Sequence, residues 1–396
     1  TEEEIKELEK QVYFTVQDAQ GNYLRVNGKD GNYTYSGIKD VEARFMLSDG
    51  KFSISMLPTG TYTVTEYNNA PGYSPAVQEV TISVKRNQTA VAEFVNTRDT
   101  GTAEINKKWT APVSLTEEEI KELEKRITFT VKDKDNKYLI VSGNNGVYSY
   151  AGVQEEEARF VIKDSVFKIE NLPTGTYIVT EYNSLENYSP KEQNVTVHVT
   201  KDSVESVEFI NDRDTGEAEI VKIWQTSASL SKEDVARLEK DVMFTVKDKD
   251  GRYFKVGTVK NGKYIFEDVQ EEATYFKLIN SKIAIVNVPT GEYEVTEINN
   301  APGYLPKTET VKITVTKDTA TKIEFTNKAI TGNVEIIKVD EDYPDVKLTG
   351  AEFTIFEMDK KTVVGKLTEV EKGVYRYDGL LYGEYYLQET KAPENF

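Results

Sequence analysis

Lysine, glutamate and asparagine recur along this chain at nearly fixed spacing. Two complete sets are present, namely Lys107, Glu181 and Asn211, and then Lys222, Glu297 and Asn327. Glu66 and Asn96 repeat the last two positions 115 residues upstream of the first set. In all three cases the asparagine follows the glutamate by 30 residues. Such regular spacing indicates one repeated site and not a scatter of polar residues.

The local alternation of apolar residues predicts that these side chains point into a core. A strand has a period of two, so Ile105, Lys107 and Trp109 share one face while Lys108 lies on the other. The other five members continue the apolar face of their own segments in the same way, within residues 177–181, 207–211, 220–224, 293–297 and 323–327. All three members of each complete set are therefore predicted to be buried.

Burial would change the chemistry of these groups. Removing an ammonium and a carboxylate from water costs several kcal/mol per ion, which lowers the pKa of a lysine and raises the pKa of a glutamate. A neutral amine is a nucleophile, and a protonated glutamic acid can polarise the asparagine carbonyl and pass protons to the leaving ammonia. The pattern predicts Lys107–Asn211 and Lys222–Asn327 amide crosslinks. The alternative is a set of buried residues that only form hydrogen bonds, at a standing cost in each domain.

Composition excludes several other kinds of site. The chain has 396 residues, no cysteine and a single histidine, so disulfides, histidine metal clusters and a histidine-based hydrolytic triad are not expected. A net charge of −18 argues against binding to nucleic acid or to an anionic membrane. No apolar run is long enough to span a bilayer. We expect no cofactor.

Short alternating segments separated by turns predict an all-β fold. Residues 127–131 are one such segment, and residues 172–175 and 248–251 are typical turns. One short helix is expected between the first two strands of each long repeat. Its signature is a capping box, seen at residues 116–119 and 231–234, and residues 1–10 repeat the same segment.

The repeat spacing predicts four domains joined by short polar connections. Each asparagine is followed by the next lysine after 11 residues, which favours a semi-rigid rod of domains. The expected domains are residues 1–100, 101–215, 216–331 and 332–396. Lys107 precedes Glu181 by 74 residues, so the lysine that matches Glu66 would lie upstream of Thr1. We therefore expect domain one to lack its first strand and Asn96 to lack a crosslinking partner.

Short motifs around the glutamates indicate a family. Val-Thr-Glu ends at Glu66, Glu181 and Glu297, and Ala-Pro-Gly-Tyr follows at 70–73 and 301–304. These motifs resemble the collagen-adhesin B-type (Cna-B, SpaA-like) domains of Gram-positive surface proteins and pilins. Domain two departs from the second motif, with Leu-Glu-Asn-Tyr at 185–188. The resemblance implies tandem immunoglobulin-like β-sandwiches that carry autocatalytic intramolecular isopeptide bonds.

The resemblance extends to the last domain and implies further site residues. Leu-Gln-Glu-Thr at 387–390 is another spelling of the glutamate motif, so Glu389 joins Glu66, Glu181 and Glu297 as a catalytic glutamate. Glu389 lies only seven residues from the last residue, whereas the other glutamates precede their asparagine by 30. Domain four is therefore expected to lack its last strand, and Lys338 to lack an asparagine partner.

The function expected from these observations is mechanical. The chain would be an extracellular, cell-wall-anchored stalk or pilus-like region that acts as a self-crosslinked spacer in adhesion. Attachment to peptidoglycan by sortase, and contact with host matrix or cell-surface proteins, would involve other regions of the protein. The alternative is an adhesin module that itself binds a host ligand, because repeats can multiply weak binding. A turnover enzyme is disfavoured, since the only reactive constellation consumes itself.

Overall fold

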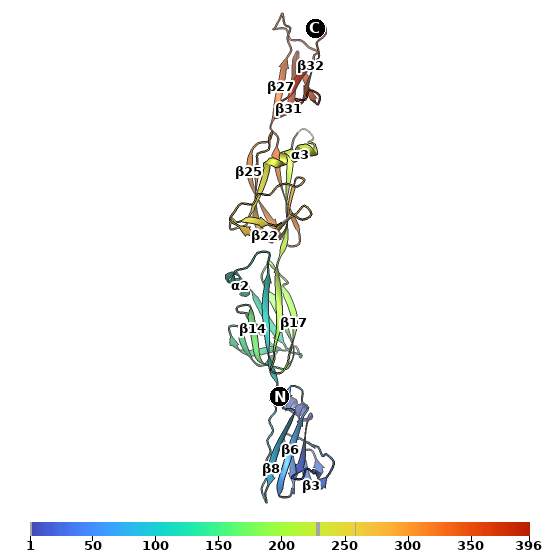
Figure 1. Cartoon of the computed structure of the whole chain (residues 1–396), viewed down its shortest axis with the longest axis vertical. Helices are drawn as coiled ribbons and strands as arrows, with labels where there is room; N and C mark the ends of the chain where they lie inside the picture. Colours follow the sequence, from blue (N-terminus) through green and yellow to red (C-terminus); the bar gives the residue numbers. More distant parts are fainter. Residues whose placement is uncertain (1, 227–229, 258) are drawn as a thin grey trace. The chain divides into compact units, whose positions relative to one another are not determined.

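The computed structural model describes residues 2–226, 230–257 and 259–396 as a succession of β domains (Figure 1). Short strands dominate every domain, and short helices occur near the start of the first three. The all-β prediction is confirmed. Among the described residues, no helix is long and apolar enough to cross a membrane.

Domain one begins with helix α1 (Glu2–Glu9) and continues as a sheet in the order β5-β3-β2-β1-β6-β8, with β4 paired to β1. Strands β7 and β9 form a separate pair. The strands are β1 (Val12–Asp18), β2 (Tyr23–Lys29), β3 (Asn32–Lys39), β4 (Phe45–Met46), β5 (Ser53–Ser55), β6 (Gly60–Asn68), β7 (Tyr73–Ser74), β8 (Val77–Val84) and β9 (Thr97–Arg98). Residues 88–96 are not part of a strand.

Domain two is a nine-stranded sheet in the order β16-β18-β10-β14-β13-β12-β11-β15-β17. Its elements are β10 (Thr100–Thr110), α2 (Glu117–Glu124), β11 (Ile127–Lys132), β12 (Tyr138–Asn144), β13 (Val147–Gln154), β14 (Val166–Pro173), β15 (Gly175–Asn183), β16 (Tyr188–Ser189), β17 (Glu192–Val199) and β18 (Val204–Arg213). Both halves of the sheet contribute to one core, in which Phe129 of β11 packs on Phe167 of β14 and Phe209 of β18. The sheet therefore folds over into two layers.

Domain three repeats this arrangement in the order β25-β24-β20-β21-β22-β23-β19-β26. Its elements are β19 (Thr215–Gln225), α3 (Lys232–Leu238), the 3₁₀ turn η1 (Glu239–Asp241), β20 (Val242–Lys247), β21 (Tyr253–Val256), β22 (Tyr264–Gln270), β23 (Lys282–Pro289), β24 (Gly291–Asn299), β25 (Lys307–Val315) and β26 (Ala320–Lys328). The first strand, β19, pairs in parallel with the last, β26, so that Lys222 lies opposite Phe325 and Trp224 lies opposite Asn327. The two ends of the domain are thus neighbouring strands.

Domain four is smaller, and its described residues contain no helix. Two three-stranded sheets have the orders β27-β31-β30 and β29-β28-β32. The strands are β27 (Thr331–Ile337), β28 (Glu352–Phe356), β29 (Val363–Lys366), β30 (Thr368–Glu371), β31 (Val374–Leu381) and β32 (Tyr386–Lys391). A small core forms between the two sheets around Phe353 and Tyr375, whose ring centroids are 5.1 Å apart.

The predicted helix caps are present in domains two and three. Thr116 accepts a hydrogen bond from the backbone N–H of Glu119, and the Glu119 side chain accepts one from the backbone N–H of Thr116. Ser231 and Asp234 form the same box before α3. These caps satisfy backbone N–H groups that would otherwise lack a partner at the start of a helix. The matching position of α1 is Thr1, which lies outside the described residues.

Candidate crosslinking sites

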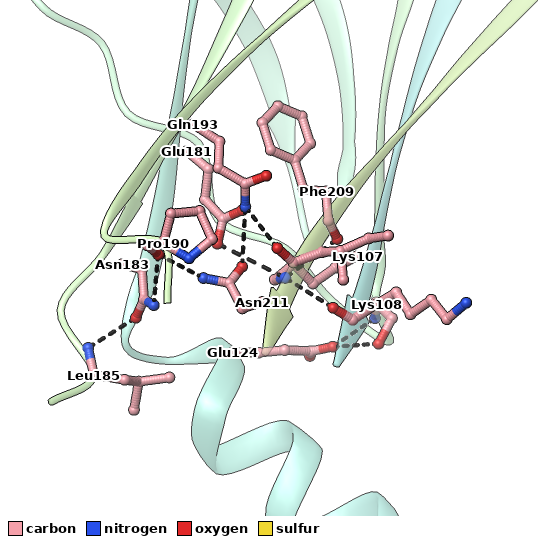
Figure 2. A network of polar contacts seen from close by, with 12 residues as sticks. Lys107, Lys108, Glu124, Glu181, Asn183, Leu185, Pro190, Gln193, Phe209 and Asn211 are labelled. Atoms are coloured by element: carbon pink, nitrogen blue, oxygen red, sulfur yellow. Dashed lines mark hydrogen bonds and ion pairs between the residues drawn. The ribbon is translucent and has the colours of Figure 1, made fainter. Parts of the chain in front are cut away.

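Lys107 enters the core of domain two from the middle of β10. Its side chain is fully buried, while the neighbouring Lys108 is exposed, as the alternation predicts. The Lys107 ammonium nitrogen lies 3.8 Å from Glu181 Oε1 and donates hydrogen bonds to the backbone carbonyls of Lys108 and Phe209, at 3.0 and 3.2 Å (Figure 2). Phe209 is on β18, so the lysine reaches from the first strand of the domain to its last.

Glu181 and Asn211 complete the constellation from β15 and β18, and both are buried. Gln193 of β17 connects them, because its Nε2 donates to Glu181 Oε2 at 3.2 Å and to Asn211 Oδ1 at 3.4 Å (Figure 2). Asn211 Nδ2 in turn donates to the carbonyl of Pro190 at 2.9 Å. The three predicted residues therefore come together, with the asparagine held at both ends of its amide.

The electrostatics of this site favour a protonated glutamate. Burial raises the pKa of Glu181 to about 7, although the nearby Lys107 ammonium and Asn211 amide both act to lower it. Desolvation dominates because the carboxyl is surrounded by core side chains and has almost no contact with solvent. At neutral pH, Glu181 therefore exists in both protonation states, which suits a group that must both accept and donate protons.

Domain three places its own three residues in a tighter arrangement. Lys222 of β19 and Glu297 of β24 have fully buried side chains, and their Nζ and Oε1 atoms are 3.1 Å apart. Asn327 of β26 donates from Nδ2 to Glu297 Oε1 at 3.2 Å. Lys222 also donates to the carbonyl of Phe325 at 3.2 Å, as Lys107 does to Phe209. The second predicted set is therefore assembled as well.

Burial shifts both ionisable groups of domain three toward their neutral forms. Desolvation lowers the pKa of Lys222 against the opposing effect of Glu297, and desolvation raises the pKa of Glu297 against the opposing effect of Lys222. Within the described part of the chain, two buried oxygens, Glu297 Oε2 and Asn327 Oδ1, have no hydrogen-bond partner. A proton on the carboxyl would turn Oε2 into a donor and Asn327 Oδ1 is an acceptor, so the neutral acid matches this site better than the carboxylate does.

A tryptophan covers the amine in both domains. The Lys107 nitrogen lies 4.3 Å from the ring centroid of Trp109, and the Lys222 nitrogen lies 4.6 Å from that of Trp224. In each case the tryptophan follows the lysine by two residues, so the period of a strand brings the ring over the amine. The ring removes water from the amine and fixes the direction in which the long side chain extends.

The last residue of helix α2 helps to hold the strand that carries Lys107. Glu124, the last residue of α2, accepts hydrogen bonds from the backbone N–H and the hydroxyl of Ser165, at 2.6 and 2.8 Å. Ser165 has a positive φ of 62°, and its carbonyl accepts a hydrogen bond from the backbone N–H of Lys107 at 2.8 Å. The helix thereby fixes the strand position from which Lys107 extends.

Domain three has the same support. The Ser281 hydroxyl donates to Glu239 at 2.5 Å, and the Ser281 carbonyl accepts from the backbone N–H of Lys222 at 2.8 Å. Ser281 also has a positive φ, of 61°. A serine in the left-handed region is uncommon. Its recurrence at the same place in two repeats indicates that the carboxylate of the helix end holds this turn in shape.

Domain one contains the glutamate and the asparagine without a lysine. Glu66 is buried, and burial raises its pKa. Asn96 Nδ2 donates to Glu66 Oε1 at 2.9 Å, and Gln78 Nε2 donates to Glu66 Oε2 at 2.8 Å and to Asn96 Oδ1 at 3.1 Å. The glutamine bridge of domain two is therefore reproduced around this pair, while the asparagine amide nitrogen donates to the glutamate and not to a backbone carbonyl.

Domain four contains the lysine and the glutamate without an asparagine. The Lys338 nitrogen lies 3.1 Å from Glu389 Oε2, but their side chains are 28% and 32% exposed. The pair is therefore reachable by water, unlike the pairs of domains two and three. Lys338 thus has an ion-pair partner in Glu389, and it remains without an amide to attack among the described residues.

The glutamine that orients the site was not anticipated from the sequence. Gln78 and Gln193 each follow their glutamate by 12 residues, and Glu309 takes the same place after Glu297. They face those glutamates directly across an antiparallel strand pair. The constant distance of 12 residues could have identified this position from the sequence. The change from glutamine to glutamate in domain three hides the repeat from a search for identical residues.

Comparison with known protein families places this fold and these sites in context. The SpaA prealbumin-like fold domain matches four segments, residues 2–98, 115–213, 226–329 and 332–396. The chain therefore belongs to the SpaA family of prealbumin-like domains, present here in four copies. The predicted resemblance is confirmed. No curated protein sequence matches the chain.

Several solved structures are similar to the chain. The chain is similar to the Bacillus anthracis TIE protein at 20% identity and a TM-score of 0.50, over 96% of this chain and 63% of that one. It thus spans less than two thirds of that protein's length. BcpA, the major pilin subunit of Bacillus cereus, is similar at 15% identity and a TM-score of 0.32, over 74% and 88%. A streptococcal ancillary pilin is similar at 17% identity and a TM-score of 0.25, over 75% and 91%.

Proposed function

We propose that domains two and three each form one intramolecular Lys–Asn isopeptide bond, and that the chain serves as a mechanical spacer in a cell-surface protein. The observation that supports this most is the same in both domains. A lysine and a glutamate with fully buried side chains lie in contact beside a buried asparagine. An ion pair left in such a place would cost several kcal/mol in desolvation, whereas an amide bond removes the buried amine.

The reaction begins with a proton transfer inside the buried pair. Glu181 takes a proton from Lys107, which leaves a neutral amine and a neutral acid. A neutral amine has two N–H donors, which can keep the hydrogen bonds to the carbonyls of Lys108 and Phe209 while the lone pair attacks. The protonated Glu181 donates to the amide oxygen of Asn211 and so makes its Cγ more electrophilic.

The second stage releases ammonia. The amine nitrogen bonds to Cγ of Asn211, and Glu181 moves a proton from that nitrogen to the departing Nδ2. The Cγ–Nδ2 bond then breaks, so one amine and one primary amide become one secondary amide and one ammonia. The carboxyl is regenerated and does not appear in the product. Lys222, Glu297 and Asn327 carry out the same sequence in domain three.

The position of the bond suits a protein under tension. In domain three it would join β19 and β26, the strands through which the chain enters and leaves the domain. A pulling force would then pass through the amide without separating the sheets. Closing a loop of about 100 residues also stabilises a domain by roughly 5 kcal/mol if the chain-entropy relation for disulfides applies. These properties favour an extracellular stalk or pilus-like region, anchored in the cell wall and carrying host-binding regions elsewhere.

The mass of the intact protein tests this proposal. The folded chain of 396 residues should weigh less than its sequence mass by two ammonia molecules. Peptide mapping should locate one link between Lys107 and Asn211 and the other between Lys222 and Asn327. A homogeneous, folded sample with the full sequence mass would refute the crosslinks.

A further inference from the structure

The connections between the first three domains share a sequence motif that the crosslinking sites do not use. Asp-Thr-Gly occupies residues 99–101 in the first connection and residues 214–216 in the second. The third connection reads Ile-Thr-Gly at residues 330–332. In each case the first residue of the motif follows the asparagine of the preceding domain by three residues. The three positions are therefore equivalent, and only the first two carry a carboxylate.

The backbone of this first residue is hydrogen-bonded on both sides at every connection. The Asp99 N–H donates to the carbonyl of Gly72 in domain one at 2.7 Å, and the Asp99 carbonyl accepts from the N–H of Thr174 in domain two at 3.0 Å. These bonds do not involve the side chain. The same two bonds recur at the other connections, with the partners Asn187 and Thr290 around Asp214 and the partners Gly303 and Tyr382 around Ile330.

The carboxylate of Asp99 adds an ionic contact to these backbone bonds. Lys201 lies in the turn between β17 and β18, and its Nζ is 2.9 Å from Asp99 Oδ1. The same nitrogen donates to Ser74 Oγ of domain one at 2.7 Å. The interactions of Asp99 with Ser74 and then with Lys201 lower its pKa, so the carboxyl is charged at neutral pH. One lysine of domain two therefore contacts both the connection and the preceding domain.

The same contacts recur around Asp214. Lys317 Nζ lies 2.9 Å from Asp214 Oδ1 and donates to Ser189 Oγ at 2.6 Å. At the third connection Ile330 replaces the aspartate, and Leu305 follows its tyrosine directly, where the other two repeats have the serine. The aspartate and the serine are thus either both present or both replaced. This indicates that the two residues act together.

The glycine of the motif lets the turn that carries the lysine come close. A Cβ on Gly101 would lie 2.3 Å from the carbonyl oxygen of Thr200, the residue before Lys201. A Cβ on Gly216 would lie 2.2 Å from the carbonyl oxygen of Thr316, which precedes the second lysine in the same way. Any side chain at these two positions would push the turn away. The motif therefore supplies both the carboxylate and the space that its lysine needs.

We propose that the Asp-Thr-Gly connection is an ionic clasp, in which a lysine of the following domain holds the aspartate of the connection and a serine of the preceding domain. The clasp restricts bending at the first and second connections. A partly exposed ion pair contributes modestly, so the clasp biases the connection toward one arrangement without locking it. None of its residues belongs to a crosslinking site, and the proposal is independent of the proposed function.

Bending at the first connection can be measured in the full chain. The chain has no cysteine, so cysteines introduced at the exposed Thr81 of domain one and Thr196 of domain two can carry a pair of spin labels. Asp99→Asn and Lys201→Met should each raise the population outside the main label-to-label distance by roughly two- to fivefold. The double variant should match the single ones, because each substitution removes the same contact. Unchanged distances in both single variants, or additive effects in the double variant, overturn the proposal.

A matched control separates the clasp from a general effect of charge. Asp202→Asn removes one negative charge directly beside Lys201 and leaves the carboxylate of Asp99 in place. Its distance distribution should match that of the parent chain. Broadening equal to that of Asp99→Asn would assign the effect to net charge and overturn the clasp. Thermal unfolding of all variants, followed by circular dichroism, should match the parent, because the clasp lies outside the hydrophobic cores of both domains.

Discussion

Domains two and three hold the same three reactive residue types in different surroundings. In domain two, the neutral side chain of Gln193 donates to both the glutamate and the asparagine. In domain three, the matching residue is Glu309, which faces Glu297 across the β24–β25 pair and forms an ion pair with Lys307 at 2.5 Å. The distance from lysine to glutamate is 3.8 Å in domain two and 3.1 Å in domain three.

The difference shows which features the site requires. Lys307 lowers the pKa of Glu297 while Glu309 raises it, so the ion pair of domain three acts on the site in two opposing directions. Desolvation is the largest influence on the pKa of the buried glutamate in both domains. Burial of the lysine and the glutamate is therefore the shared determinant, and the residue beside them is free to vary in charge.

The largest expected effect is on extension under force, and it should differ completely between domains two and three. Asn327→Ala should allow domain three to extend by its full sequestered length in single-molecule stretching, while domain two remains closed. Asn211→Ala should produce the opposite result. Each substitution removes the covalent tie between the first and last strands and keeps the lysine and the glutamate. Full extension of domain three in the parent chain at the same force would falsify the mechanical role.

A second variant shows that the effect comes from the bond and not from a damaged core. Lys222→Met removes the same tie but leaves Glu297 buried without its cation, which by itself destabilises a domain by roughly 3–5 kcal/mol unless the acid is protonated. Agreement between Lys222→Met and Asn327→Ala in extension length would assign the loss to the crosslink. If the two variants differ only in unfolding force, the difference would measure the destabilisation caused by the unpaired Glu297 carboxyl.

The next effect is the complete loss of one crosslink, which the mass of the intact chain reports. Glu181→Ala should block the crosslink of domain two, so that the chain loses one ammonia instead of two. Glu297→Ala should block the crosslink of domain three in the same way, because each glutamate relays protons in its own domain only. Glu181→Gln should behave like Glu181→Ala, since an amide cannot carry the proton. Intact mass spectrometry of the three variants checks this. Complete crosslinking in Glu181→Gln would show that the carboxyl is not the relay.

A smaller effect is expected on the pH dependence of stability in domain two. The folded-state pKa of Glu181 is about 7 against an ordinary value of 4.5, so the folded state holds the proton more tightly than the unfolded state. In the uncrosslinked variant Asn211→Ala, the free energy of unfolding should therefore fall as pH rises between these values, by roughly 3 kcal/mol at most.

Tryptophan fluorescence allows domain two to be followed by itself. The chain has two tryptophans, so Asn211→Ala combined with Trp224→Phe leaves only Trp109 of β10 as a probe. Denaturant unfolding at roughly pH 5 and pH 8 then measures the change in stability. Glu181→Gln in the same background should remove most of the difference. A stability that rises with pH would show that the carboxyl is not protonated in the folded state.

The smallest effect concerns the bridging glutamine. Gln193→Ala should slow crosslinking of domain two by roughly tenfold, since two weak hydrogen bonds that orient the amide and the acid contribute about 1–1.5 kcal/mol. Glu309→Ala in domain three should change the rate less, because the described partner of Glu309 is Lys307. Cell-free synthesis with an acid quench and mass spectrometry at successive times measures both rates. Equal slowing by the two substitutions would mean that Gln193 and Glu309 contribute equally to the rate of crosslinking.

Much of the site could be predicted because strand periodicity fixes which side chains point inward. The alternation around Lys107 was enough to choose it over Lys108, and the same argument located both glutamates and both asparagines. Two other features depend on which elements become neighbours. The bridge from Gln193 and the support of Ser165 by Glu124 join residues of different elements, and periodicity within one element carries no information about them.

The spacing of the repeat predicted other features that a single strand could not. The distance between lysine and glutamate indicated that Glu66 has no matching lysine within this sequence. The exposure of the Lys338–Glu389 pair was not foreseen. Domain four has a small core of two three-stranded sheets, and its burial depends on that packing and not on the local alternation.

The deep burial of the lysine has a consequence for the order of events during biosynthesis. Lys107 is made 104 residues before Asn211, and many other asparagines could meet it in the meantime. In an unfolded chain, however, a lysine has a pKa of about 10.4 and remains a charged, unreactive ammonium. In the proposed mechanism, only the closed core makes the amine nucleophilic, and at that moment the amide beside it is that of Asn211. The fold would therefore delay the proposed irreversible bond until the correct strands are neighbours.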